Sequence, residues 1–190
     1  MNHADTFRWI SIAVSIILGL GVARLLTAAV AQFHARRHRT LDWLPITWAA
    51  TIFLQQLVFW WSLDELIIIV PRWTMGGFAL LVGLALMLFL AAALILPHSD
   101  TGRTLGMRDF FEEDGRFALP ILAAFNVLAL IADRVFWSVE LTSEAVALNV
   151  VLILLPLVAF RAARPLQATA TLAYAVIAVG GTIDIAPATY

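Results

Sequence analysis

The hydrophobic positions of the chain fall into six long runs, and the charged residues gather in the short stretches between them. Each run approaches the ~20 residues that a helix needs to cross the hydrocarbon core of a bilayer. The predicted transmembrane helices span residues 7–33, 43–66, 74–96, 117–139, 144–160 and 165–183. We therefore predict an all-α fold, a polytopic membrane helical bundle of six transmembrane helices in which residues 1–190 form a single domain.

The arginines are distributed unevenly between the two sides of this bundle. The loops after the first, third and fifth predicted helices contain eight of the twelve basic residues, whereas the opposite loops contain only Arg8 and Arg72. Basic loops stay on the cytoplasmic side of a membrane. We therefore predict the bacterial inner (cytoplasmic) membrane, with the N-terminus and the C-terminus both periplasmic.

The second and fourth predicted helices have the same layout. Each has an early proline, Pro45 or Pro120, and a late aromatic group that includes Trp61 or Trp137. One interpretation is a parallel duplication of helices 2–3 onto 4–5, which places a pseudo-two-fold axis along the membrane normal and a site between helices 2 and 4. The other is that any helix crossing in this direction favours an early proline and a late aromatic belt.

Residues 109–117, which precede the fourth predicted helix, read DFFEEDGRF. Residues 107–116 are expected to form one or two helical turns, with Glu112 and Arg116 at the spacing of a helical ion pair. In this layout the chain resembles small alphaproteobacterial-type multi-pass membrane proteins. The resemblance is diffuse across the chain, and it implies no activity and no site.

The composition narrows the chemistry of the chain. It has no cysteine, and all of its basic residues are arginine, so thiol and Schiff-base chemistry are excluded. The net charge of -1 argues against a nucleic-acid partner. His34 and His38 lack a third ligand nearby, so we predict neither a metal site nor a cofactor. We expect a protein that is not an enzyme; an intramembrane enzyme is the alternative.

Polar side chains nevertheless occur inside the predicted spans. Gln55 lies on a polar face of helix 43–66, and Gln56 lies off that face. Counted at ~1.5 Å per residue, five polar side chains from five helices reach a similar depth near the middle of the bundle. They are Arg24, Gln55, Asn126, Asn149 and Tyr174. We predict a polar, ligand-binding chamber around Arg24; the alternative is that Arg24 reaches the cytoplasmic headgroups and the amides hold helices together.

A second polar group lies nearer the outer surface. Asp133 and Arg134 are close to the end of helix 117–139, and Asp64 and Glu65 end helix 43–66. One interpretation is a structural ion pair in which Arg134 meets an acidic residue of a neighbouring helix end. The other is a carboxylate on a proton or cation path.

A seam of small residues runs along the first predicted helix, formed by Ser11, Ser15, Gly19 and Ala23. Such seams let another helix approach closely, so we expect self-association or contact with another membrane protein. Together with the polar layer, this favours a non-enzymatic accessory or assembly component that binds membrane lipids or a lipid-like ligand. The alternative is a small oligomeric transporter or channel that passes an anion or polar solute along the layer around Arg24.

Overall fold

The computed structural model describes residues 3–35, 41–97, 106–137 and 142–185. Within these ranges every regular element is helical, which confirms the all-α prediction there. The long helices are α1 (His3–Ala35), α2 (Trp43–Ile69), α3 (Met75–Ile95), α5 (Ala118–Ala132), α6 (Ser143–Arg161) and α7 (Arg164–Ile185). Three short elements complete the chain: α4 (Met107–Glu113), the 3-10 helix η1 (Gly115–Phe117) and the π-helix η2 (Asp133–Trp137).

Four helical segments of the described chain are long and apolar enough to cross a membrane. They are Asp5–Ala35, Trp43–Ile69, Met75–Ile95 and Gly115–Trp137. The apolar part of α6, Val146–Arg161, is shorter. By length and composition the fold is therefore consistent with a membrane protein, and crossing by all six long helices stays a prediction.

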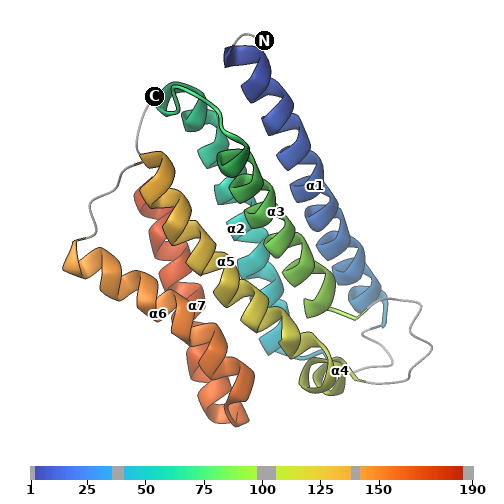
Figure 1. Ribbon diagram of the computed structural model, residues 1–190. Coiled ribbons are helices and arrows are strands. Elements are labelled where there is room, and N and C mark those ends of the chain that lie inside the picture. The colour runs from blue at the N-terminus through green and yellow to red at the C-terminus, as the bar shows by residue number, and fades with distance from the viewer. Residues whose placement is uncertain (1–2, 36–40, 98–105, 138–141, 186–190) are drawn as a thin grey trace.

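Five of the long helices form a closed ring. In order around it, α2 packs against α3, α3 against α5, α5 against α6, α6 against α7, and α7 against α2. Helix α1 lies outside the ring, against α2 and α3, and α6 runs obliquely to its neighbours (Figure 1). The interior of the ring is therefore bounded by α2, α3, α5, α6 and α7, and not by α1.

Contacts at the two ends of the bundle give the direction of the helices. At one end, Gln32 Nε2 donates to the Pro97 carbonyl oxygen at 3.5 Å, which brings the ends of α1 and α3 together. We call this the α4 end, because α4 also lies here (Figure 1). At the opposite end the Trp73 ring contacts both Phe7 and Phe136, with centroids 5.7 and 6.2 Å away. At this Trp73 end α1 begins, and α2 and α5 end.

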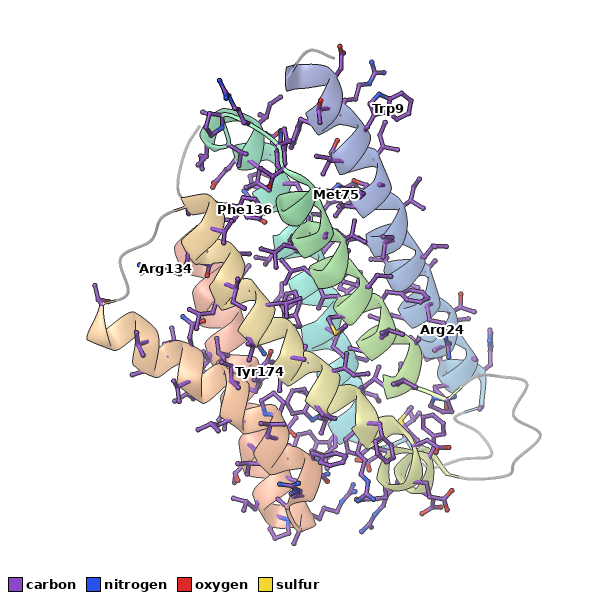
Figure 2. The ribbon with its side chains drawn as sticks, in the orientation of Figure 1. Trp9, Arg24, Met75, Arg134, Phe136 and Tyr174 are labelled. Atoms are coloured by element: carbon purple, nitrogen blue, oxygen red, sulfur yellow. The ribbon has the colours of Figure 1, made fainter. Side chains whose placement is uncertain are left out.

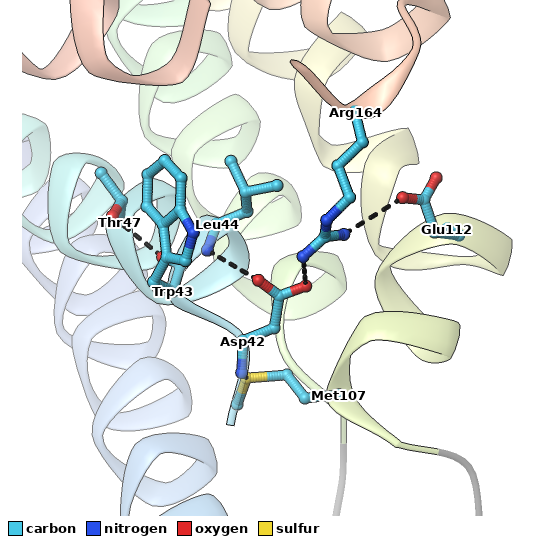
Figure 3. Close-up of polar contacts among 7 residues, drawn as sticks. All are labelled: Asp42, Trp43, Leu44, Thr47, Met107, Glu112 and Arg164. Carbon is cyan, nitrogen blue, oxygen red and sulfur yellow. Dashed lines mark hydrogen bonds and ion pairs between the residues drawn. The ribbon is translucent and has the colours of Figure 1, made fainter. Parts of the chain in front are cut away.

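Residues far apart in the sequence meet at the α4 end. The Asp42 carboxylate caps α2 by accepting from the Leu44 N–H at 3.2 Å, and it forms an ion pair with Arg164 at the start of α7 (Figure 3). Arg164 Nη1 also lies 3.4 Å from Glu112 Oε1 of α4. The expected Glu112–Arg116 pair is therefore replaced by a Glu112–Arg164 pair. The Arg116 guanidinium instead lies over the Phe117 and Phe160 rings.

Helix α1 packs tightly against a side chain of α2 at Gly21. A Cβ atom added there would lie 2.5 Å from Gln56 Nε2. The predicted seam lies on a different face of α1, because Gly19 and Ala23 are exposed and a Cβ on Gly19 would meet no heavy atom within 4 Å. Within the described chain the seam therefore packs against no other helix at Gly19, and a partner for it stays a prediction.

Candidate functional site

Three polar side chains from opposite sides of the ring meet near its middle. Gln55 Nε2 on α2 donates to the Tyr174 hydroxyl oxygen on α7 at 2.6 Å, and Asn126 Nδ2 on α5 donates to the same oxygen at 3.1 Å. The Tyr174 side chain is fully buried, and its ring stacks against Trp48 with centroids 5.0 Å apart. We call these residues the Gln55–Asn126–Tyr174 cluster; it links α2, α5 and α7.

A cavity of about 470 Å³ lies inside the ring, between this cluster and the Trp73 end. Its walls are mostly apolar and include Phe59, Leu81, Leu84, Phe125 and Leu152. Its polar lining residues include Gln55, Asn126, Asn149, Ser62, Glu65, Asp133 and Thr182. Small-molecule sites in proteins have this character: they are concave, mainly apolar, and carry a few polar groups, in ~300–1,000 Å³.

The π-helix η2 forms part of the cavity wall. A π-turn widens the helix by one residue, and such segments are frequent at functional sites. Here Asp133 and Trp137, the first and last residues of η2, both line the cavity. Trp137 Nε1 also donates to Glu65 Oε2 at 3.2 Å, which joins η2 to α2.

The structure brings together four of the five residues predicted for the polar layer. Gln55, Asn126 and Asn149 line the cavity, and Tyr174 is hydrogen-bonded to the first two. Arg24 lies elsewhere: its Nη2 donates to the Ala93 carbonyl oxygen on α3 at 3.2 Å, outside the ring (Figure 2). Arg24 is therefore not among the residues that line the cavity, because a depth along the helix does not say which way a side chain points; a ligand site at Arg24 stays a prediction.

The four residues predicted at the outer surface divide into two groups. Glu65, which is exposed, and Asp133, which is half-buried, line the cavity, whereas the exposed Asp64 and Arg134 do not. The partner that the structure gives Glu65 is Trp137. Among the described residues, the Asp133 carboxylate takes part in no hydrogen bond or ion pair. Asp133 is thus available to whatever occupies the cavity.

Sequence reasoning missed the role of Gln56. Its side chain is 1% exposed, and its Nε2 donates to the Leu88 carbonyl oxygen on α3 at 3.4 Å. Consecutive helical residues point about 100° apart, so Gln55 faces the ring while Gln56 faces α1 and α3. The signal in the sequence that could have indicated this role is the adjacent pair Gln55 and Gln56, because a helix that packs against neighbours on two sides can bury both side chains.

The described residues contain no group of three or more His, Cys, Asp or Glu side chains placed to hold a metal ion. Comparisons of the chain with protein-family models, with curated proteins and with solved structures find no match, so the function is argued from the cavity and its lining.

Proposed function

We propose that this protein is a multi-pass component of the bacterial inner membrane that binds a lipid-like molecule inside its helical ring. The observation that carries this proposal is the cavity of about 470 Å³ with its apolar walls. Its polar residues lie at two levels, one beside the Gln55–Asn126–Tyr174 cluster and one nearer the Trp73 end. The protein acts by holding this molecule, as an accessory or assembly component, and does not transform it.

The walls of the cavity suit an acyl chain or a similar apolar body. Protein interiors are normally close-packed, and the apolar side chains that face this partly open cavity lack such contacts on one side. A chain lying against Leu81, Leu84 and Leu152 restores those contacts. The polar residues at the two levels then position a headgroup or another polar part of the ligand.

The proposal includes six membrane crossings and periplasmic termini. It is supported by the arginines around the α4 end: Arg108 in α4, Arg116 in η1, Arg161 as the last residue of α6 and Arg164 as the first of α7. The positive-inside rule places such an end in the cytoplasm. The cavity, which extends toward the Trp73 end, then lies in the periplasmic half of the membrane.

The alternative, a transporter or channel for an anion or polar solute, has less support. It needs Arg24 in the solute path, yet Arg24 is bonded to Ala93 outside the ring. Among the described residues, the cavity lining contains no arginine or histidine. Beyond the Gln55–Asn126–Tyr174 cluster, the buried Trp48 ring fills the interior on the α4 side. Binding therefore accounts for the site better than conduction does.

Two adjacent glycines provide a test. Gly181 lines the cavity and Gly180 does not, and a Cβ atom at either position would meet no heavy atom within 4 Å. Gly181→Phe should therefore fill the cavity without breaking the helix packing, and Gly180→Phe is the matched control. Each protein is purified in mild detergent, and its bound lipids are quantified by mass spectrometry.

We expect a lipid-like molecule to co-purify with the wild-type protein and with Gly180→Phe. Its amount should fall about tenfold or more in Gly181→Phe, which corresponds to a loss of about 1.4 kcal/mol of binding free energy. Equal retention by both variants, in proteins that melt at the same temperature, would contradict binding in this cavity.

A further inference from the structure

The polar groups that line the cavity also indicate the charge of its ligand. We propose that the ligand carries a protonated amine, bound by Asp133 and Glu65, with its apolar body along the cavity walls. This inference rests on the proposed function, the binding of a lipid-like molecule, and it adds the chemical class of that molecule.

The hydrogen-bond donors near the Trp73 end of the cavity are already engaged. Ser62 donates its hydroxyl to the Phe59 carbonyl oxygen and Thr182 donates to the Ala178 carbonyl oxygen, both at 2.8 Å. The Trp137 indole N–H is directed to Glu65 at 3.2 Å. A hydroxyl group has one proton and two acceptor lone pairs. Each of these hydroxyl groups can therefore offer a ligand only acceptor oxygens.

Near the Gln55–Asn126–Tyr174 cluster the amide nitrogens are hydrogen-bonded within the protein. Gln55 Nε2 donates to Tyr174, and the two hydrogens of Asn126 Nδ2 are shared among the Tyr174 hydroxyl oxygen and the Leu122 and Leu152 carbonyl oxygens. Gln55 Oε1 is buried and has no hydrogen-bond partner among the described residues. Buried polar atoms are normally paired. The atom that this level leaves unpaired is thus an acceptor too, and it calls for a donor.

The charges agree with the hydrogen-bond groups. Within the part of the chain that the structure describes, the cavity lining includes two carboxylates, Asp133 and Glu65, and no arginine or histidine. Arg134, next to Asp133, is exposed and is not part of the lining. A half-buried carboxylate in a mostly apolar wall attracts a cation more strongly than one in bulk water does. An anionic headgroup would meet like charges and would find few donors.

Aromatic side chains provide a third reason to expect a cation. Phe59, Trp61 and Trp137 line the cavity together with the two carboxylates. Aromatic faces attract ammonium groups, by ~0.5–2 kcal/mol per pair. A quaternary ammonium would use the charge alone, whereas a protonated amine also supplies the N–H donors that the carboxylate, hydroxyl and amide oxygens accept.

Three amphiphiles with the same short chain separate these contributions. Octylamine is protonated at neutral pH and carries charge and N–H donors, octyltrimethylammonium carries the charge alone, and octyl sulfate carries the opposite charge. Binding is measured by titration calorimetry on the full chain in nanodiscs of neutral phosphatidylcholine, and the heat from empty nanodiscs is subtracted. We expect octylamine to bind about tenfold or more tightly than octyltrimethylammonium, and octyl sulfate to show no saturable binding.

Two acidic residues at the Trp73 end provide matched variants. Asp133→Asn removes a carboxylate from the cavity lining, and Asp64→Asn removes one that is exposed and outside the lining. Both change the net charge equally. The affinity for octylamine should fall about tenfold in Asp133→Asn and stay within about twofold of wild type in Asp64→Asn. Glu65→Gln should also weaken binding, and it serves as the test if Asp133→Asn does not fold.

Other results would overturn the inference in distinguishable ways. Equal losses in Asp133→Asn and Asp64→Asn would mean that the surface charge attracts the amine without a site in the cavity. Saturable binding of octyl sulfate at least as tight as that of octylamine would mean that the cavity selects an anionic ligand and not a protonated amine. If no amphiphile binds but co-purified lipid still depends on Gly181, the amine is wrong and the proposed function stands; if lipid retention is also insensitive to Gly181→Phe, both fail.

Discussion

At the scale of single residues, Tyr174 holds together three helices of the ring. Its hydroxyl oxygen accepts from Gln55 and Asn126, and its ring packs on Trp48. Tyr174→Phe keeps the ring and leaves the Gln55 amide without an acceptor, so we expect a loss of about 1–2 kcal/mol of unfolding free energy. Tyr174→Ala also removes the buried ring and should lose about 3–5 kcal/mol. Unfolding in detergent, followed by circular dichroism, measures both; a Tyr174→Phe variant as stable as the wild type would mean that the hydroxyl contributes nothing.

Residue depth could be predicted from the sequence, and residue direction could not. The rise of a helix is constant, so counting from the helix ends put Gln55, Asn126 and Tyr174 at one level, and in the structure they are hydrogen-bonded. The same count put Arg24 at that level, although it points to Ala93. The direction of a side chain relative to other helices depends on which helices are neighbours, and the sequence does not contain that information in readable form.

At the scale of elements, the Asp42–Arg164–Glu112 contact connects the starts of α2 and α7 to α4 (Figure 3). The Asp42 side chain is 5% exposed, whereas that of Glu112 is 42% exposed. Arg164→Ala leaves the buried Asp42 carboxylate without its cation, so we expect a loss of about 2–3 kcal/mol of unfolding free energy. Glu112→Ala removes only the exposed partner and should lose less than about 1 kcal/mol. Thermal unfolding of both variants checks the ranking, and the reverse order would contradict it.

Two glycines of α1 distinguish packing inside the chain from packing against a partner. A side chain at Gly21 would collide with Gln56 Nε2 and disturb its bond to Leu88, so Gly21→Val should destabilise the protein by about 1–3 kcal/mol. Gly19 has open space around it, so Gly19→Val should change stability by less than about 0.5 kcal/mol. If the seam mediates self-association, Gly19→Val should shift the protein toward the monomer in cross-linking experiments. An unchanged oligomeric state in Gly19→Val would mean that the seam does not mediate self-association.

The limits of sequence reasoning also appear within one helix. The predicted helix 117–139 corresponds to η1, α5 and η2, so its position and length were largely predicted. The π-turn at Asp133–Trp137 was not, because one extra residue in a turn leaves no change in composition or periodicity. That turn shifts the register of the side chains beyond Asp133 relative to those of α5.

At the scale of the whole molecule, the helices could be predicted and their arrangement could not. Six apolar runs correspond to the six long helices, because hydrophobic length and polar breaks are local properties of a sequence. The closed ring with α1 outside depends on pairings between distant segments, such as α2 with α7. The cavity is formed by those helix pairings. Its lining therefore includes residues that the sequence predicted and also the π-turn, which no local sequence pattern predicts.

The orientation of the molecule in the membrane can be tested cleanly because the chain has no cysteine. Single cysteines replace exposed residues at the α4 end, Asp109 and Ala163, and at the Trp73 end, Asp64 and Gly180. Intact spheroplasts are treated with a membrane-impermeant maleimide. Basic segments resist translocation, so cysteines at positions 64 and 180 should react at once and those at 109 and 163 only after permeabilisation.

A further cysteine at Asp5, near the start of α1, tests whether the number of crossings between residues 5 and 180 is even. With six crossings, Asp5→Cys and Gly180→Cys must react from the same side, whereas an odd number of crossings puts them on opposite sides. The reverse pattern at all positions would leave the fold intact and place the cavity in the cytoplasmic half of the membrane. The arginines of the α4 end would then lie in the periplasm, contrary to the orientation that the positive-inside rule favours.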